Sequence, residues 1–205
     1  MNFFLLTIAL LAAYLLGSIP TAVWAGRLFM NIDIREHGSG NAGAANAIRV
    51  LGWKVGIPVL LTDMAKGWLS AMLPVFFDLA DPGSALAVNL QIATGMIAIA
   101  GHVFPVFAGF RGGKGVATTA GVLLAINPLL TLSCLAVFII VVLLTRIVSV
   151  SSISAGISFP VFLFTLFDTP SPLFKIFSVF IAVALLITHR KNIQRLLKGE
   201  EKKFF

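Results

Sequence analysis

Cysteine, histidine and charged side chains are all scarce in this sequence. Its 205 residues include one cysteine, three histidines and eight acidic residues, and only 11% of them are charged. The single cysteine, Cys134, can form neither an intrachain disulfide nor a thiolate metal cluster. The histidines and carboxylates also lack the spacing of metal ligands. These absences predict no metal site and no cysteine-based redox chemistry.

A cleavable leader and a nucleic-acid surface are not indicated either. The first apolar run, residues 3–16, has no basic start and no convincing cleavage site, so we expect a permanent span. The formal net charge is +7, but the basic residues flank apolar runs and lack the interleaved aromatics that stack on bases. We interpret them as topology signals and expect no nucleic-acid partner.

Apolar residues dominate what is present. They make up 59% of the chain, and the mean hydropathy is +1.01, which is typical of an integral membrane protein. A helix needs about 20 apolar residues to cross the hydrocarbon. The candidate spans are residues 3–24, 55–77, 86–107, 116–126, 129–145, 153–167 and 173–188. We therefore predict an all-α integral membrane protein with seven transmembrane helices.

The fourth span is the shortest. Residues 116–126 rise only about 16 Å as a helix, and Asn127-Pro128 separates this run from the next, because Pro cannot continue a helix. Fusing the two runs would leave six spans. That count would place Arg146 or the basic tail, residues 190–203, on the wrong side of the membrane, since short cytoplasmic loops carry most Lys and Arg.

With seven spans, the N-terminus lies outside and the C-terminus is cytoplasmic. The sequence contains no convincing internal repeat or separate soluble region, so residues 1–205 are expected to form a single membrane-embedded domain. This topology also brings every polar, glycine-rich loop to the cytoplasmic face. That shared face is the candidate site.

Residues 110–118 combine glycine with positive charge. Gly112, Gly113 and Gly115 would let backbone N–H groups approach an anion, a helix is predicted to begin just after them, and Lys114 adds a full charge. The stretch is not a Walker A loop, because its glycine spacing differs and no Ser or Thr directly follows Lys114. The alternative is a turn whose basic residues anchor a helix at lipid headgroups.

A second polar segment spans residues 38–49. Ser39, Asn41, Asn46 and Arg49 can donate hydrogen bonds to phosphate or hydroxyl oxygens, and Arg can bind phosphate through two bonds at once. The alternative is an interfacial helix capped by Ser39 or Asn41, with Arg49 facing headgroups. A cap explains one Asn but not two Asn together with three Gly.

A third polar segment, residues 189–195, follows the last span. His189 and Asn192 are three apart and would share a helix face, although a basic membrane anchor explains their neighbours. Ser149 and Ser152 begin the sixth span, where their hydroxyls would either complete an anion site or cap the helix.

Three further polar residues are expected to support the site. Asp63 and Lys66 lie three apart inside the second span, where they would pair and lock neighbouring helices. His102 closes the third span beside the glycine-rich loop. It is expected to orient that loop, the alternative being a hydrogen bond to a nearby carbonyl.

These groups suit acyl transfer by electrostatic positioning. Many acyltransferases place an Asp five residues after a His, but the residues at that distance here are Ala42, Phe107 and Gln194. Positioning by Arg, Lys, Asn and backbone N–H groups suffices when the acyl donor is already activated. The other class considered is a transporter for a small organic phosphate. Transporters bind near the midplane between paired repeats, whereas these polar groups gather at one face.

The polar segments carry a resemblance that covers nearly the whole chain. In order, the motifs are Gly38-Ser39-Gly40-Asn41-x-Gly43-Ala44-x-Asn46-x-x-Arg49, Asp63-x-x-Lys66-Gly67, Gly101-His102-x-Phe104-Pro105, Gly112-Gly113-Lys114-Gly115-Val116-Ala117-Thr118, Arg146-x-x-Ser149-x-x-Ser152-Ile153 and His189-x-x-Asn192-Ile193-x-Arg195-Leu196-Leu197-x-Gly199-x-Glu201. Together they resemble the bacterial acyl-phosphate-dependent glycerol-3-phosphate acyltransferases, the PlsY family. The sequence departs from the usual family pattern at Ala45, where Thr is usual, and at Arg111, where Lys is common.

The resemblance implies a seven-span enzyme of phospholipid biosynthesis in the bacterial cytoplasmic membrane, with its active site on the cytoplasmic face. It would transfer a fatty acyl group from acyl phosphate to the 1-hydroxyl of glycerol 3-phosphate, giving lysophosphatidate and inorganic phosphate. No metal, coenzyme A or other cofactor is implied. Membrane lipid surrounds the enzyme, and no protein partner is predicted.

The resemblance also implies residue roles. By position, Ser39, Arg49, Lys114, His189 and Asn192 would hold glycerol 3-phosphate, while Asn41, the backbone of residues 112–115 and Ser152 would hold the acyl phosphate. The substrate's own phosphate would assist proton removal from the hydroxyl. The predicted catalytic residues are Lys114, His189, Asn192 and Arg49. The predicted substrate-binding residues are Ser39, Asn41, Asn46, Gly112, Gly113, Gly115, Ser149 and Ser152.

Overall fold

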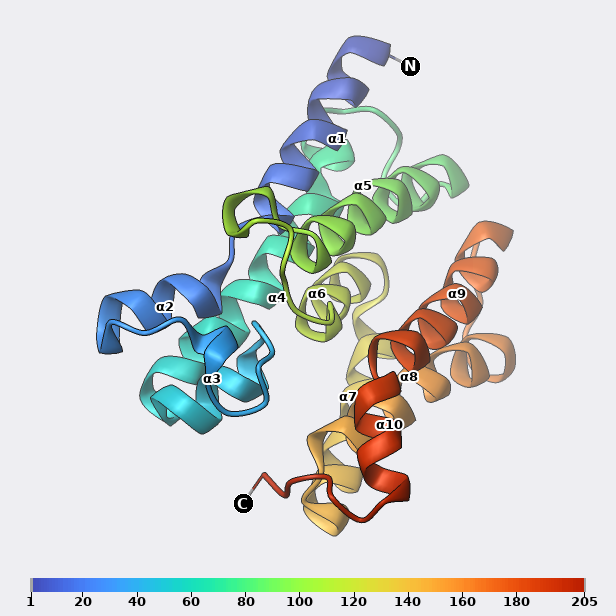
Figure 1. The fold of residues 1–205 in the computed structure, drawn as a ribbon. Coiled ribbons are helices and arrows are strands. Elements are labelled where there is room, and N and C mark those ends of the chain that lie inside the picture. Colours follow the sequence, from blue (N-terminus) through green and yellow to red (C-terminus); the bar gives the residue numbers. More distant parts are fainter. Residues whose placement is uncertain (1, 205) are drawn as a thin grey trace. The chain divides into compact units, whose positions relative to one another are not determined.

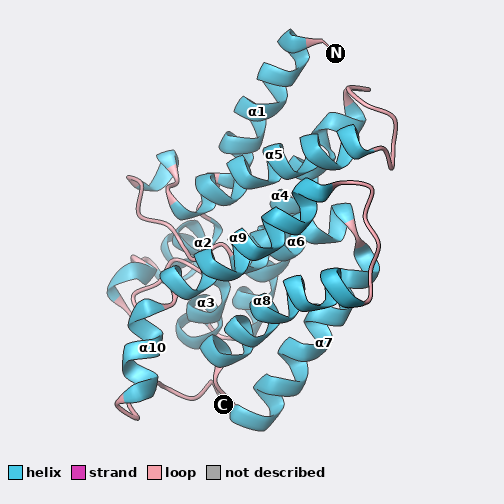
Figure 2. Ribbon diagram, turned by 90° about the vertical axis from the view of Figure 1, so that its right-hand side faces the viewer, coloured by secondary structure: helices cyan, strands magenta, loops and turns pink. Residues whose placement is uncertain are grey.

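The computed structural model describes residues 2–204, and every regular element in that range is helical (Figures 1 and 2). The α-helices are α1 (Phe3–Gly17), α2 (Thr21–Met30), α3 (Ala44–Leu51), α4 (Trp53–Phe76), α5 (Ala85–Val103), α6 (Val116–Ile126), α7 (Pro128–Thr145), α8 (Val148–Thr165), α9 (Pro172–Thr188) and α10 (Arg190–Leu197). Two short 3-10 helices, η1 (Ile34–Glu36) and η2 (Val106–Ala108), lie in the connections. The all-α prediction is confirmed for these residues.

The chain divides into two compact units at the predicted Asn127-Pro128 break. Unit 1 is Met1–Ile126 and unit 2 is Asn127–Phe205. Asn127 caps α7 by accepting the Leu130 N–H at 3.0 Å, and Pro128 occupies the first turn, where its missing N–H costs no hydrogen bond. The single domain over residues 1–205 stays a prediction, and each unit is described by itself.

Within residues 2–204, five segments are long and apolar enough to cross a membrane. They are Phe3–Met30, Trp53–Phe76, Ala85–Ala108, Pro128–Thr145 and Val148–Thr165. Helices α9 and α10 make a sixth if they are counted as one span bent by 59°. The 11-residue α6 is shorter than these, as expected. Seven crossings and the orientation of the two termini stay predictions.

The first span differs from the uninterrupted run expected over residues 3–24. Helix α1 ends at Gly17 and α2 begins at Thr21, with Ser18, Ile19 and Pro20 between them. Pro20 has no N–H to continue the ladder. The Ile19 carbonyl accepts the Thr21 N–H at 3.1 Å inside the break and a second hydrogen bond from Lys66 Nζ of α4 at 2.8 Å. A break inside an apolar segment is tolerated because bonds of this kind, local and from another helix, satisfy the freed backbone groups.

Asp63 and Lys66 form the predicted pair on α4. Lys66 Nζ lies 2.8 Å from Asp63 Oδ1, and their side chains are 4% and 1% exposed, respectively. Asp63 Oδ1 also accepts the Thr21 hydroxyl at 2.7 Å. The pair therefore joins α4 to the Ser18–Pro20 break and to the first residue of α2, which confirms the prediction that it locks neighbouring helices.

Helix α4 contacts each of the other α-helices of unit 1 (Figure 1). Its contact with α6 depends on two glycines. A Cβ at Gly67 of α4 would collide with the Thr118 carbonyl of α6, and a Cβ at Gly121 of α6 would collide with the Met64 carbonyl of α4. Small residues let two backbones approach closely. This reciprocal contact fixes the short α6, whose first turn follows the glycine-rich loop.

In unit 2, α7 packs on α8, α8 on α9, and α9 on α10. The core between α8 and α9 contains a cluster of three buried rings, Phe159, Phe174 and Phe177, with centroids 5.6–6.4 Å apart. Such aromatic contacts add to area burial. They fix α9, and through it the bend at which His189 lies.

We expect Lys66→Met to lower the stability of the folded protein. It leaves the Asp63 carboxylate buried without its ion-pair partner and removes one of the two donors to the Ile19 carbonyl, and breaking a buried pair typically costs about 3–5 kcal/mol. The melting temperature in detergent measures the effect. Lys54→Met, at an exposed position of the same helix, is the control and should melt like wild type.

The double variant Asp63→Asn/Lys66→Met should melt above Lys66→Met, because no uncompensated carboxylate remains. If Lys66→Met melts at the wild-type temperature, or the double variant melts no higher than Lys66→Met, then the pair does not stabilise the break.

Candidate functional site

Asn46 shapes the first polar segment from inside. The side chain is 1% exposed. Its Oδ1 accepts the Ser39 N–H at 2.8 Å, and its Nδ2 donates to the carbonyls of Ile34 and His37 at 3.0 and 3.1 Å. Through these bonds the Asn46 amide holds the backbone of residues 34–39 in place. Because both ends of the amide are already bonded to backbone groups, the geometry favours a supporting role for Asn46 over the direct substrate contact that was expected.

The other predicted residues of this segment lie nearer the surface. Ser39 and Arg49 are exposed and Asn41 is half-buried. The alternative in which Ser39 or Asn41 caps the helix is wrong: the N-cap of α3 is Gly43, with no side-chain cap bond. Arg49 lies in the last turn of α3. Ser39 and Arg49 are thus placed to reach a ligand, while Asn46 holds the loop beneath them.

The glycine-rich loop is tied to the end of α5. The Gly112 N–H donates to the Val103 carbonyl at 3.1 Å, and the Gly113 N–H donates to the His102 carbonyl at 3.2 Å. A Cβ at Gly112 would collide with that same His102 carbonyl. Gly112 and Gly113 are therefore required for close packing, and their N–H groups face inward. This corrects the expectation that these two N–H groups would approach an anion directly.

The N–H groups able to face an anion begin after Gly113. Gly115 has φ +81°, a conformation that favours glycine, and its carbonyl accepts the Thr119 N–H at 2.7 Å as the first bond of α6. The preceding N–H groups of the helix start have no intrahelical acceptor, and they carry the positive end of the helix dipole. Lys114 lies at this start and is half-buried. Helix starts of this kind bind phosphate and carboxylate groups.

Unit 1 brings its two polar segments together. A Cβ added to Gly113 would lie 3.3 Å from the carbonyl oxygen of Ala42, between Asn41 and Gly43. The glycine-rich loop therefore lies directly beside residues 41–43. The segment that contains Asn41 and the loop that contains Lys114 were expected to lie close together, and within unit 1 they do.

His102 connects this loop to the buried pair on α4. Its ring is 6% exposed, and Nδ1 lies 3.7 Å from Asp63 Oδ1. On the other side of the ring, Nε2 fills the space that a Cβ of Gly113 would occupy. With its carbonyl also accepting the Gly113 N–H, His102 contacts the loop through both side chain and backbone. The prediction that it orients the loop is confirmed as a contact.

In unit 2, His189 lies at the bend between α9 and α10. It is the residue between the two helices, and it is buried. Its Nδ1 lies 2.9 Å from the Leu185 carbonyl, and since a carbonyl only accepts, Nδ1 is assigned as the protonated donor of this bond. The bend, rather than one continuous helix face, sets the position of His189 relative to Asn192.

Asn192 and Ser149 meet at a carboxylate that was not predicted as a site residue. Glu201 Oε1 accepts Asn192 Nδ2 at 2.5 Å and the Ser149 hydroxyl at 2.8 Å. Its Oε2 accepts Arg195 Nε at 2.6 Å. The C-terminal tail also contacts the connection between α7 and α8, because the Phe204 N–H donates to the carbonyl of Arg146, the C-cap residue of α7, at 2.7 Å. Glu201 therefore joins three parts of unit 2.

The charge of Glu201 is stabilised by these partners. Burial acts to raise its pKa, but the hydrogen bonds from Asn192, Arg195 and Ser149 and the charge of Arg195 outweigh burial, so the pKa lies below its ordinary value. The only sequence signal for Glu201 was its place in the last motif. Its partner Ser149 lies 52 residues away, a separation at which pattern analysis gives no contact.

The serines of α8 do not cap the helix. The N-cap is Ile147, with no side-chain cap bond. Ser152 is buried and its hydroxyl donates to the Val148 carbonyl one turn earlier, at 2.9 Å. Because that bond uses the only proton of the Ser152 hydroxyl, the oxygen has no further proton to donate to an anion. In this geometry Ser149 and Ser152 both donate within unit 2, which differs from the anion site expected at the helix start.

No group of three or more His, Cys, Asp and Glu side chains within residues 2–204 is arranged to hold a metal ion. The polar groups described in the two units include fixed positive charge, amide donors, helix-start N–H groups and the imidazoles of His102 and His189. Such groups bind phosphate and stabilise developing negative charge.

Comparison with known proteins identifies a family for this chain. A family model described as Glycerol-3-phosphate acyltransferase matches residues 7–199. The chain is 45% identical to the glycerol-3-phosphate acyltransferase of Chlorobium phaeobacteroides (strain BS1), over 97% of this chain and 96% of that protein. It is also 45% identical to the protein of the same name from Chlorobaculum tepidum, over 94% of this chain and 93% of that protein.

Two solved structures are similar along almost the whole chain. Both are crystal structures of PlsY (YgiH), an integral membrane glycerol 3-phosphate acyltransferase. The glycerol 3-phosphate form has 35% identity and a TM-score of 0.85, covering 98% of this chain and 96% of that one. The lysophosphatidic acid form has 36% identity and a TM-score of 0.83, covering 97% and 94%. The chain thus belongs to the PlsY family of integral membrane glycerol-3-phosphate acyltransferases.

Proposed function

We propose that this enzyme transfers a fatty acyl group from acyl phosphate to the 1-hydroxyl of glycerol 3-phosphate, releasing lysophosphatidate and inorganic phosphate. The observation that carries the proposal is the similarity, over 98% of the chain, to PlsY in its glycerol 3-phosphate form. The similarity to the lysophosphatidic acid form supports the proposed product. The choice of acyl phosphate as the donor rests on the motif resemblance.

Unit 1 supplies phosphate-binding groups in this proposal. Lys114, Ser39 and Arg49 would hold glycerol 3-phosphate, and the N–H groups at the start of α6 would hold the acyl phosphate. Asn41 and Gly115 would contribute to the acyl-phosphate group. Gly112, Gly113 and Asn46 would act by shaping these segments, as their inward hydrogen bonds suggest.

Unit 2 supplies His189 and Asn192 in this proposal. Both are buried polar side chains, and both would bind glycerol 3-phosphate through hydrogen bonds. Ser149 and Glu201 would act indirectly by holding Asn192 in place, and Ser152 by shaping the first turn of α8. Lys114, His189, Asn192 and Arg49 would be the catalytic residues.

The reaction needs no covalent intermediate on the protein. The hydroxyl oxygen would attack the acyl carbonyl carbon, the bond from that carbon to the phosphate oxygen would break, and inorganic phosphate would leave with the electron pair. The proton would pass from the hydroxyl to the phosphate of the same glycerol 3-phosphate. Acyl phosphate is already activated, so positioning of two anions and stabilisation of the developing oxyanion would lower the barrier.

The proposed setting is a bacterial cytoplasmic membrane. Seven crossings, counting α6 and α9 as spans, would put the N-terminus outside and the polar segments of both units on the cytoplasmic side, where soluble glycerol 3-phosphate is available. Acyl phosphate would enter from the bilayer. The placement of Lys and Arg along the sequence supports this orientation.

The first prediction concerns the donor and the metal requirement. Purified protein in detergent with EDTA should convert radiolabelled glycerol 3-phosphate and palmitoyl phosphate to lysophosphatidate, because fixed protein charges do the work of a metal. Palmitoyl coenzyme A in place of palmitoyl phosphate should give no product. Product from coenzyme A, or activity only after metal addition, would contradict the proposed donor or mechanism. A transporter would give no product with either donor.

The second prediction concerns the proposed catalytic residues. Lys114→Ala and Asn192→Ala should each lower kcat/KM by about 100-fold or more, the usual cost of removing a donor from a charged transition state. The melting temperature should show that both variants fold. Lys54→Ala and Gln194→Ala, at exposed positions of α4 and α10, are the matched controls. Wild-type rates in Lys114→Ala and Asn192→Ala would remove both residues from the site.

The third prediction concerns Glu201. Glu201→Gln should destabilise the protein at pH 7 by about 1–3 kcal/mol, because it weakens the bonds to Arg195 and Asn192. Since the folded pKa lies below the ordinary value of 4.5, the stabilisation is complete above pH 4.5 and is lost as the pH falls through the folded pKa. The gap in melting temperature between wild type and Glu201→Gln should therefore narrow in acid. A gap independent of pH would show that the charge is not what stabilises the tail.

A further inference from the structure

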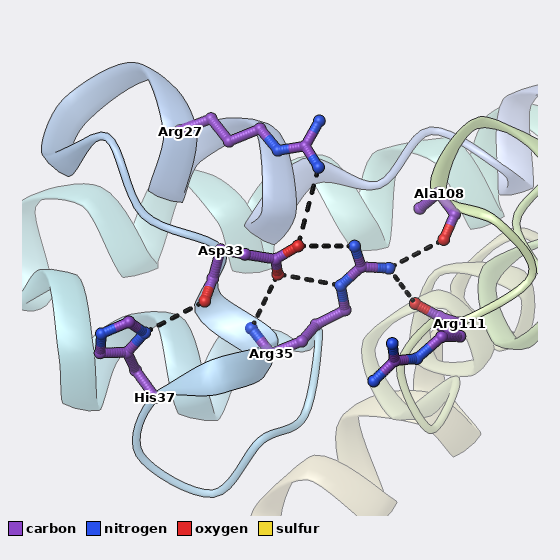
Figure 3. Close-up of polar contacts among 6 residues, drawn as sticks. All are labelled: Arg27, Asp33, Arg35, His37, Ala108 and Arg111. Carbon is purple, nitrogen blue, oxygen red and sulfur yellow. Dashed lines mark hydrogen bonds and ion pairs between the residues drawn. The ribbon is translucent and has the colours of Figure 1, made fainter.

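Arg35 makes contacts that a topology signal would not need. Figure 3 shows its guanidinium between Asp33 on one side and the loop before Gly112 on the other. Nε and Nη2 donate to the two oxygens of Asp33 at 2.9 and 2.6 Å. Nη1 donates to the carbonyls of Ala108 and Arg111 at 2.8 and 3.3 Å. One side chain therefore connects the segment before Ser39 to the loop before Lys114.

The Arg35–Asp33 pair is fixed at its own end. Asp33 is the N-cap of η1, and its Oδ1 also accepts the Arg35 N–H at 3.0 Å. The Arg35 and Asp33 side chains are 14% and 20% exposed. The hydrogen bond from Arg35 holds the pKa of the Asp33 carboxyl well below its ordinary value, so the pair stays ionised at neutral pH. A bidentate pair of this kind keeps the fork in one orientation.

The loop end of the contact is a backbone turn that needs support. Gly109 and Phe110 both have positive φ, at +61° and +59°, and the left-handed conformation costs a non-glycine residue such as Phe110 about 1–2 kcal/mol. Arg35 bonds the carbonyls on both sides of these two residues, at Ala108 and Arg111 (Figure 3). Gly112, Gly113 and Lys114 follow this turn immediately. The direction of the backbone as it comes out of the turn therefore determines the position of Lys114.

The other end of the contact is continuous with the first polar segment. The carbonyls of Ile34 and His37, on either side of Arg35 and Glu36, accept the two Asn46 bonds. The His37 ring adds a contact from Nδ1 to the Asp33 carbonyl at 3.1 Å (Figure 3). The Arg35 backbone thus belongs to the same hydrogen-bonded unit that presents Ser39. A shift of Arg35 would move Ser39 and the Lys114 loop apart.

We propose that the Arg35–Asp33 pair is a positioning device that holds the turn at residues 108–111, and with it Lys114, at a fixed place beside the Ser39 segment. The proposal rests on the proposed function, since it takes Lys114 to bind a substrate phosphate. Lys cannot replace Arg35, because a single ammonium cannot span two carboxylate oxygens and two carbonyls as a planar guanidinium does. Arg35 touches no reacting atom in this scheme.

Arg27 provides the matched control. It is the second arginine near Asp33, with Nη2 3.7 Å from Oδ2, but its side chain is 62% exposed. Its contact with Asp33 is the one ion pair found for it in the described residues, and no dashed line joins Arg27 to Ala108 or Arg111 in Figure 3. Arg27→Lys therefore changes the same ionic surroundings without changing the loop contact.

The experiment compares wild type with Arg35→Lys, Asp33→Asn and Arg27→Lys in detergent. Three kinds of measurement are made: the melting temperature, KM and kcat for glycerol 3-phosphate with palmitoyl phosphate, and hydrogen exchange of peptides across the chain.

Arg35→Lys should raise KM by about tenfold, the loss expected for one charge-assisted hydrogen bond, and should lower kcat less than it raises KM. Asp33→Asn should show the same effect in weaker form. Exchange should speed up at residues 108–115 and remain unchanged at residues 78–84. Arg27→Lys should match wild type throughout.

Two results would overturn the proposal. One is a wild-type KM with unchanged exchange at residues 108–115 in Arg35→Lys. The other is faster exchange along the whole chain with a lower melting temperature, which would show general loss of structure instead of positioning.

The proposed function fails in a different way. If Lys114→Ala turns over normally while Arg35→Lys still speeds exchange at residues 108–115, then Arg35 holds the loop but the loop binds no substrate, and positioning for catalysis is rejected. If Lys114→Ala is inactive and Arg35→Lys behaves like wild type, the phosphate-binding role stands and the Arg35 proposal alone is lost.

Discussion

Polar groups in the apolar interior must find their partners within the protein, and this constraint shapes unit 1. At membrane depth an unpaired carbonyl or charge costs several kcal/mol. At the Ser18–Pro20 break the Ile19 carbonyl accepts the Thr21 N–H, and Lys66 from α4 gives it a second hydrogen bond. Lys66 then needs a counter-charge, which Asp63 supplies one turn earlier, and Asp63 in turn lies beside His102. One interruption in a helix thus accounts for a chain of buried polar side chains that ends at the glycine-rich loop.

Hydrogen-bond partners inside the protein distinguish the residues that build the candidate site from the residues exposed at its surface. Asn46 uses both ends of its amide on backbone groups, and the N–H groups of Gly112 and Gly113 are bonded to α5. Groups already bonded inside the protein cannot also hold a substrate without a loss elsewhere. A motif therefore contains two kinds of residue at neighbouring positions: some, such as Asn46, fix the backbone, and others, such as Ser39, are exposed at its surface.

Much of this was predictable from the sequence, and the failures have a common cause. Hydropathy located the helices that are long and apolar enough to cross a membrane, though not the break at residues 18–20, and the three-residue spacing of Asp63 and Lys66 predicted their pairing, because both signals are local. Arg35 and Glu201 were missed because their partners lie 73 and 52 residues away, beyond the reach of any periodicity. The inward direction of the Gly112 N–H was missed for a similar reason, since glycine spacing shows that a backbone is flexible but not which way its donors point.

In the proposed mechanism the supports of the charged groups matter as much as their contacts with the two anions. The proposed catalysis relies on positioning, which a shift of about 1 Å can spoil. Lys has a flexible stem, so the place of its charge is set chiefly by the backbone that carries it. In unit 1 that backbone, just before Lys114, is bonded to Arg35, and the residues after it pack on α4 through Gly121. Basic residues that flank membrane helices are therefore of two kinds. Residues such as Arg27 have an exposed side chain and contribute mainly a positive charge, whereas residues such as Arg35 hold neighbouring backbone segments in place through hydrogen bonds of fixed geometry.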